Sequence, residues 1–174
     1  MKRNRHFVVR STVSLALVCA VVMVALAQEA PKSSQSTARG YPDLVGGLKA
    51  VEGCIGVETA RTQGGKNVIF AWFENKDAVK RWYYSDTHRG AMGMFFPEAE
   101  PAEPLKDIPD GAGPILAIAS ITFSDKDKMK ESAMPISQIS IELYQPLSGG
   151  LYIGSRFAPE GLKVPKMKDY TPKK

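Results

Sequence analysis

The chain has 174 residues and a formal net charge of +5, from 23 Lys and Arg against 18 Asp and Glu. Four of the basic residues and none of the acidic ones lie in the first 27 positions, which leaves 19 basic against 18 acidic residues in the rest of the chain. Nucleic-acid binding depends on a basic surface that neutralises phosphates, so we do not expect this function.

Residues 1–27 have the pattern of a secretory signal peptide. Basic residues at the N-terminus precede the apolar run VSLALVCAVVMVALA, which ends in the small-residue cleavage pattern Ala25-Leu26-Ala27. The run is short for a membrane-spanning helix, which needs about 20 apolar residues, so cleavage is favoured over an uncleaved anchor. The sequence predicts a periplasmic or secreted protein that meets the membrane only through this segment, before cleavage.

The rest of the chain divides into three parts by composition. Residues 28–40 are small and polar without apolar periodicity, and we interpret them as a flexible linker. Residues 41–165 are long enough for one domain with one core. Residues 166–174 are basic and contain proline, and we expect a loose tail.

Removal of a signal peptide would leave one cysteine, Cys54, and one histidine, His88. An intramolecular disulfide would then be impossible, and a metal site normally needs several such ligands, so neither is predicted. Cys54 begins a predicted strand and has no nearby feature that would lower the pKa of its thiol, so we expect it to be buried and inert.

The first predicted elements are a short helix, a hairpin and a second helix. Asp43 can cap a helix over the sequence PDLVGGLKAVEG. Two β-type runs at 54–61 and 67–73 flank a Gly-Gly turn, which predicts a hairpin. Asn75 can cap the next helix, whose apolar residues share one side and which should end near Ser85.

The second half of the chain predicts mainly strands. An apolar stretch up to Phe96 could form another short helix, and residues 97–113 read as a long surface loop. The sequence PILAIASITFS predicts a buried strand, and 137–157 predict a hairpin. The mixture predicts an α+β domain, an antiparallel sheet with helices on one face.

Residues 53–92 carry a family resemblance. A Gly-rich entry to the first hairpin strand, an aromatic end of the second strand and the pattern Ser85-x-x-His88 follow one another. This stretch resembles the antibiotic biosynthesis monooxygenase-like family. The resemblance implies a ferredoxin-like fold that pairs into a dimeric α+β barrel, and hence a homodimer. The family's first strand would fall in the polar linker, so the hairpin 137–157 could replace it in a permuted domain.

The resemblance also implies a function, the oxygenation of a small aromatic molecule without a cofactor. His88 would handle the proton and Arg89 would orient the substrate. The residues implied in substrate binding are Trp72, Phe73, Trp82, Tyr83 and Tyr84. Because side chains alternate along a strand, Trp72 and Phe73 should face opposite sides, and only one of them can line a cavity.

Two alternatives remain open at this point. The stretch is also similar to haem-degrading relatives of the family, which implies haem bound through Met92 or His88. The other alternative is a non-catalytic module for ligand binding or dimerisation. The aromatic residues named above could instead form the core, because their spacing also suits buried positions on a strand and a helix. His88 could instead lie at a helix C-terminus, where the helix dipole favours its positive charge.

Overall fold

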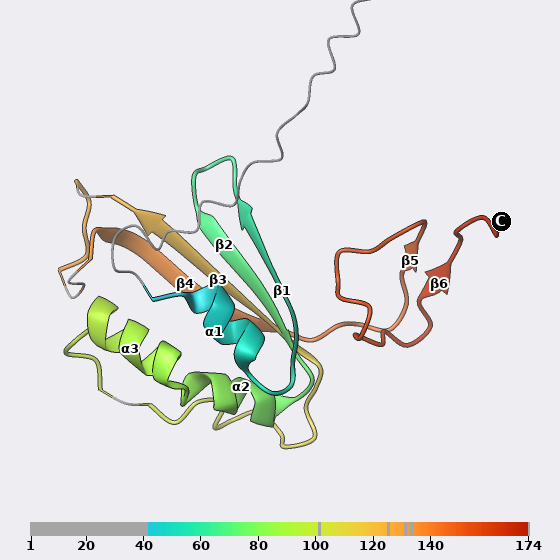
Figure 1. Ribbon diagram of the computed structural model, residues 1–174, viewed down its shortest axis with the longest axis horizontal. Helices are drawn as coiled ribbons and strands as arrows, with labels where there is room; N and C mark the ends of the chain where they lie inside the picture. Colours follow the sequence, from blue (N-terminus) through green and yellow to red (C-terminus); the bar gives the residue numbers. More distant parts are fainter. Residues whose placement is uncertain (1–41, 101, 125, 131, 133, 174) are drawn as a thin grey trace, which may run out of the picture. The chain divides into compact units, whose positions relative to one another are not determined.

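A computed structural model describes residues 42–100, 102–124, 126–130, 132 and 134–173. The predicted signal peptide and linker lie outside these residues. The described elements are a four-stranded antiparallel sheet, three helices and a small C-terminal pair of strands (Figure 1). None of the helices in the described residues is both long and apolar enough to cross a membrane.

The first half of the fold follows the sequence pattern closely. Helix α1 (Leu44–Ala50) begins at Asp43, whose carboxylate accepts a hydrogen bond from Gly46 N. Strands β1 (Cys54–Arg61) and β2 (Asn67–Phe73) form the predicted antiparallel hairpin. Gly65 has a φ of +84° in the turn, a conformation that glycine adopts without strain.

Two helices follow the hairpin without an intervening loop. Helix α2 (Lys76–Tyr83) is capped by Asn75, whose side-chain oxygen accepts from Ala78 N. Helix α3 (Asp86–Phe95) begins immediately afterwards, with Ser85 as its N-cap. The prediction of a second short helix is therefore confirmed, although it begins earlier in the chain than expected.

Strands β3 (Ile115–Phe123) and β4 (Ile136–Tyr144) complete the sheet in the order β1-β2-β3-β4. The three helices lie on one face of the sheet, so the predicted α+β architecture is confirmed (Figure 1). We refer to this as the helix-side face, and to the other as the open face.

The predicted hairpin over 137–157 is wrong. Strand β4 pairs with β3, and Leu151–Tyr152 instead form strand β5, parallel to strand β6 (Lys168–Asp169). The chain turns away after β4 because Pro146 has no N–H to donate, and Gly149 and Gly150 adopt φ values of +108° and +95°. The strand beside β2 is therefore β3, which follows α3 in the chain.

Two apolar clusters join the sheet to the helices. One contains Phe73, which is fully buried, and packs β2 and β3 against α1 and α2. The other contains Phe95 and Ile136 and packs α3 against β3 and β4. Both clusters lie on the helix-side face, which explains why the short helices are held in place.

The long loop at 97–113 is tied to helix α2. Lys76 is only 5% exposed, and its ammonium donates to Ile108 O at 2.6 Å and to Asp110 Oδ1 at 2.8 Å. The hydroxyl of Tyr83 donates to Ala102 O at 2.8 Å and accepts from Ala102 N. Lys76 N also donates to Ala112 O at 3.2 Å, so four hydrogen bonds and an ion pair connect a single helix to both halves of the loop.

Candidate functional site

The predicted catalytic histidine lies where helix α2 gives way to helix α3. Ser85 Oγ accepts a hydrogen bond from His88 N at 3.2 Å, so Ser85-x-x-His88 begins a helix. The interpretation that His88 ends a helix and is favoured there by the dipole is wrong. In the first turn of α3 the dipole opposes a positive charge on the imidazole.

His88 belongs to an aromatic cluster at this corner. The centre of its ring lies 5.4 Å from that of Trp82 and 4.9 Å from that of Tyr83. Tyr84 packs edge-on against Tyr83 at 5.1 Å and is itself exposed. We call Trp82, Tyr83, Tyr84 and His88 the corner cluster. Trp82 also packs against the core that contains Phe73, so the cluster joins core to surface.

Burial determines the protonation state of His88. Loss of water around the half-buried imidazole lowers its pKa below 6.5, and a hydrogen bond to the backbone of Tyr83 opposes this only in part. The ring is therefore neutral near pH 7 and can accept a proton. This is the chemical property that a general base requires.

Arg89 and Met92 are the other two candidate site residues on α3. Arg89 is exposed, and its guanidinium pairs with Asp86 Oδ1 at 2.7 Å, one turn back on the same helix. Met92 is partly buried one turn beyond His88. The described contacts do not bring Arg89 into the corner cluster, and its ion pair with Asp86 accounts for its charge.

His88 and Met92 do not fit a haem site. Haem binding needs an open position at the iron ligand and a large apolar slot beside it. The imidazole of His88 is held between two aromatic rings. Met92 lies one helical turn beyond His88 on α3 and is only partly buried.

Trp72 and Phe73 lie on opposite faces of β2, as the alternation of strand side chains predicts. Phe73 belongs to the core under the helices. Trp72 lies on the open face, where its ring meets that of Phe157 at 5.2 Å and that of Phe70 at 6.3 Å. Trp72 lines a cavity, whereas Phe73 is fully buried in the core.

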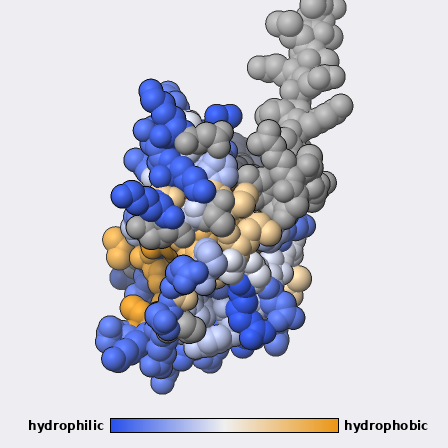
Figure 2. Space-filling view, turned by 90° about the vertical axis from the view of Figure 1, so that its left-hand side faces the viewer, coloured by the Kyte–Doolittle hydropathy of each residue, from blue (hydrophilic) through white to orange (hydrophobic). Residues whose placement is uncertain are grey.

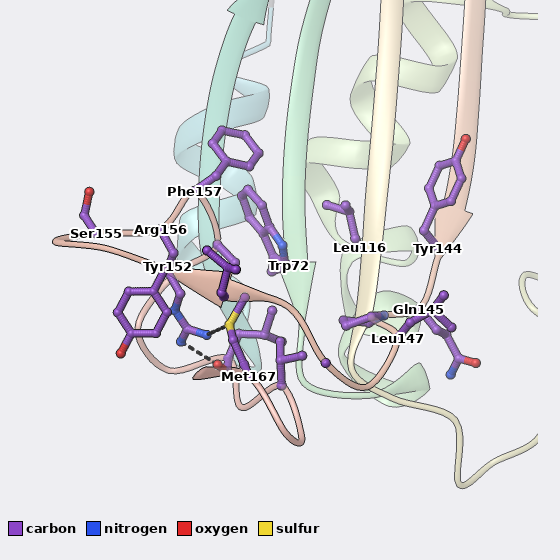
Figure 3. A pocket seen from close by; sticks show the side chains of 16 residues that line it. Trp72, Leu116, Tyr144, Gln145, Leu147, Tyr152, Ser155, Arg156, Phe157 and Met167 are labelled. Carbon is purple, nitrogen blue, oxygen red and sulfur yellow. Dashed lines mark hydrogen bonds between the residues drawn. The ribbon is translucent and has the colours of Figure 1, made fainter. Parts of the chain in front are cut away.

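This cavity of about 530 Å³ lies between the open face and the C-terminal segment (Figure 3). The sheet contributes Trp72, Leu116 and Tyr144, and the C-terminal segment contributes mainly apolar side chains, among them Phe157 and Met167. Its size is in the range of small-molecule sites, and such sites are usually apolar with a few polar groups. We call it the Trp72 groove.

Arg156 holds the C-terminal side of the groove in shape. Its guanidinium donates to three backbone carbonyl oxygens, those of Pro159, Glu160 and Leu162, at 3.0, 2.8 and 2.5 Å. It also contacts Met167 Sδ at 3.7 Å (Figure 3). Hydrogen bonds from a charged donor are the stronger kind, so Arg156 fixes this turn.

The structure thus places the predicted binding residues in three locations, with Phe73 buried in the core. Trp82, Tyr83 and Tyr84 lie with His88 in the corner cluster, whereas Trp72 lies in the groove on the open face. Sequence reasoning missed Tyr144, Phe157 and Met167. The stretch LYIGSRFA was predicted as the second strand of the hairpin, although Gly154 within it and Pro159 just after it indicate an irregular loop.

The remaining reactive groups do not form a further site. Cys54 is partly buried, and this burial raises the pKa of its thiol, as an inert cysteine requires. Among the described residues, no three His, Cys, Asp or Glu side chains lie close enough together to hold a metal ion.

Comparison with known proteins identifies one family. Residues 20–93 match the antibiotic biosynthesis monooxygenase family. The chain is antibiotic biosynthesis monooxygenase-like over this segment, which includes β1, β2, α2 and most of α3, and the resemblance predicted from residues 53–92 is confirmed.

The match begins at residue 20, inside the predicted signal peptide, so its first part lies outside the described residues. No curated protein and no solved structure matches the chain. The antibiotic biosynthesis monooxygenase-like segment contains Trp72 and the whole corner cluster. The groove's remaining lining lies beyond the match.

The lowered pKa of His88 predicts how stability depends on pH. Below about pH 6.5 the unfolded chain takes up a proton on this residue before the folded protein does. The free energy of unfolding should therefore fall as the pH drops below 6.5, and level off once the pH is below the folded pKa. NMR titration of the His88 ring, with urea unfolding at several pH values, measures both effects.

His88→Asn is the matched variant, because it removes the titration and keeps a polar side chain of similar size. The difference in unfolding free energy between the protein and this variant should change between pH 7 and pH 5. A ring that titrates at or above 6.5 would contradict the interpretation.

Proposed function

We propose that this antibiotic biosynthesis monooxygenase-like protein is exported and binds a small, flat aromatic molecule in the Trp72 groove. The observation that carries the proposal is the groove itself, a cavity of about 530 Å³ with aromatic walls from both the sheet and the C-terminal segment. Aromatic ligands gain from edge-on and offset contacts with such side chains, about 0.5–1.5 kcal/mol for each pair of rings.

The aromatic walls of the groove differ in exposure. Trp72 is only 3% exposed and is held in the sheet, whereas Phe157 is 63% exposed although its ring contacts those of both Trp72 and Phe70. A ligand ring can therefore cover Phe157 and remove its apolar surface from water, while Trp72 provides a fixed base. Tyr144 and Gln145 supply polar groups at the rim.

Export is supported by the N-terminal sequence alone. A basic start, an apolar run and a small-residue pattern ending at Ala27 are typical of a cleaved signal peptide. The protein recovered from the periplasmic or culture fraction should therefore begin at Gln28, which mass spectrometry of the intact chain measures. Recovery of the full-length chain from the cytoplasm would contradict export.

The two tryptophans of the chain report separately on the two candidate places, because Trp72 lies in the groove and Trp82 in the corner cluster. Protein labelled with 5-fluorotryptophan should give two ¹⁹F signals, which Trp72→Phe and Trp82→Phe assign. Titration with 1-naphthol should shift the Trp72 signal to saturation and leave the Trp82 signal unchanged.

Phe157→Ala should weaken this binding by about 5- to 10-fold, since it removes one aromatic contact. Phe123→Ala is the matched control, because Phe123 is an exposed phenylalanine at the far end of β3 and does not line the groove. Saturation of the Trp82 signal alone would place the ligand at the corner cluster, and a flat titration of both signals would reject the groove for this class of ligand.

The second candidate function is the cofactor-free oxygenation that the family resemblance implies. It is favoured by one observation, the neutral imidazole of His88 held against Trp82 and Tyr83. In this reaction His88 would accept the proton of an aromatic hydroxyl. The electron-rich anion would then react with O₂. The substrate supplies all the electrons: one oxygen atom enters the ring, which is oxidised to a quinone, and the other leaves as water with the two hydrogens that the substrate loses.

Oxygen uptake with 1,4-dihydroxynaphthalene tests this second function. The purified protein should increase uptake above the rate of spontaneous oxidation, and His88→Asn should lower the catalysed rate by about 100-fold, as expected for the loss of a general base. Tyr170→Phe is the control, because Tyr170 is an exposed tyrosine outside the corner cluster, and it should leave the rate unchanged. Equal rates with and without protein would leave binding as the function.

A further inference from the structure

The outer strand β4 presents an unusual edge. On the helix-side face its residues Ile141 and Leu143 are 59% and 41% exposed, and residues 141–144 are all exposed. No described strand pairs with the outer edge of β4. Figure 2, which views the side on which α3 lies in Figure 1, shows apolar surface between hydrophilic regions.

The two outer strands differ in charge. Each has one irregularity in its register, at Cys54 and Gly56 in β1 and opposite Thr122 and Phe123 in β4, but β1 also carries the charged residues Glu58 and Arg61. Bulges and charges are the features that prevent edge strands from pairing with other chains. Strand β4 has one charged residue, Glu142, and no proline, and it is nine residues long.

In the regular part of β4, residues at equal distances on either side of Ile141 have compatible side chains. The register with β3 shifts at the start of the strand, so regular alternation runs from Gln138 to Tyr144, with Ile141 at its centre. Antiparallel pairing of two such strands about a twofold axis at Ile141 would overlap all seven residues. Ile139 would lie opposite Leu143 of the second copy, and Ile141 opposite its own equivalent.

The open face of the same pairing is also complementary. Gln138 would lie opposite Tyr144 of the second copy, and Ser140 opposite Glu142. The carboxylate of Glu142 already accepts hydrogen bonds from Ser140 and Tyr144 of its own chain. With the axis at Glu142 instead, two carboxylates would face each other directly, which destabilises a strand pair.

We propose that β4 pairs edge to edge with β4 of a second copy of this chain, in an antiparallel register centred on Ile141. The two sheets then form one continuous eight-stranded sheet with all helices on the same side. This surface differs from the face-to-face barrel that the family resemblance implies, and it is independent of the ligand proposed for the Trp72 groove.

Ile141→Lys tests the interface, because it places two like charges opposite each other at the axis. Sedimentation equilibrium should show a dimer for the natural chain and a dissociation constant at least 10-fold higher for this variant. Ile153→Lys is the matched control, since Ile153 is 65% exposed but lies outside β4, and it should remain dimeric.

Disulfide trapping tests the register even if Ile141→Lys fails to fold. With both natural cysteines replaced by Ser, Ile141→Cys places two Cα atoms about 5 Å apart, within disulfide range. Leu143→Cys places them about 14 Å apart, out of range. Oxidation should cross-link the first variant and not the second.

A natural chain that remains monomeric at high micromolar concentration would overturn the proposal. So would a dimer that Ile141→Lys leaves intact and that Ile141→Cys fails to cross-link, because that result indicates a different interface. ¹⁹F titration of Trp72 in the Ile141→Lys monomer keeps this test separate from the ligand proposal.

Discussion

Strand β2 is covered on both faces, and most of the fold depends on this. Its helix-side residues Ile69, Ala71 and Phe73 hold α1 and α2, whereas Phe70 and Trp72 hold the C-terminal segment through Phe157. Because β2 also lies between β1 and β3 in the sheet, its backbone is paired on both edges. A strand fixed on four sides provides rigid positions for everything that packs on it.

This arrangement explains why the candidate residues fall into two groups. The corner cluster begins at the end of α2, which follows β2 in the chain and lies on the helix-side face. The core around Phe73 fixes α2, and α2 in turn positions His88. The Trp72 groove belongs to the open face and needs the C-terminal segment as its second wall. A neutral base and an apolar cavity are therefore present in one small domain, on opposite sides of its sheet.

The sequence was informative where local chemistry decides the structure. Turn residues predict the bounds of β1 and β2, and capping preferences predict the N-cap at Asn75. The alternation of strand side chains predicts that Trp72 and Phe73 face opposite sides. The hairpin at 137–157 failed because Pro146 and the positive φ values of Gly149 and Gly150 carry the chain away from the outer edge of β4. His88 was misplaced because Ser85 can end one helix or begin the next.

The burial of Lys76 has a consequence for chemical labelling. Its ammonium is enclosed by Ile108 O and Asp110, whereas Lys106 in the loop at 97–113 is exposed. An amine-reactive reagent can reach Lys76 only when the tie between this loop and α2 is broken. The rate at which Lys76 is modified, relative to Lys106, therefore reports how often the loop opens. Peptide mass mapping measures this rate without any substitution in the chain.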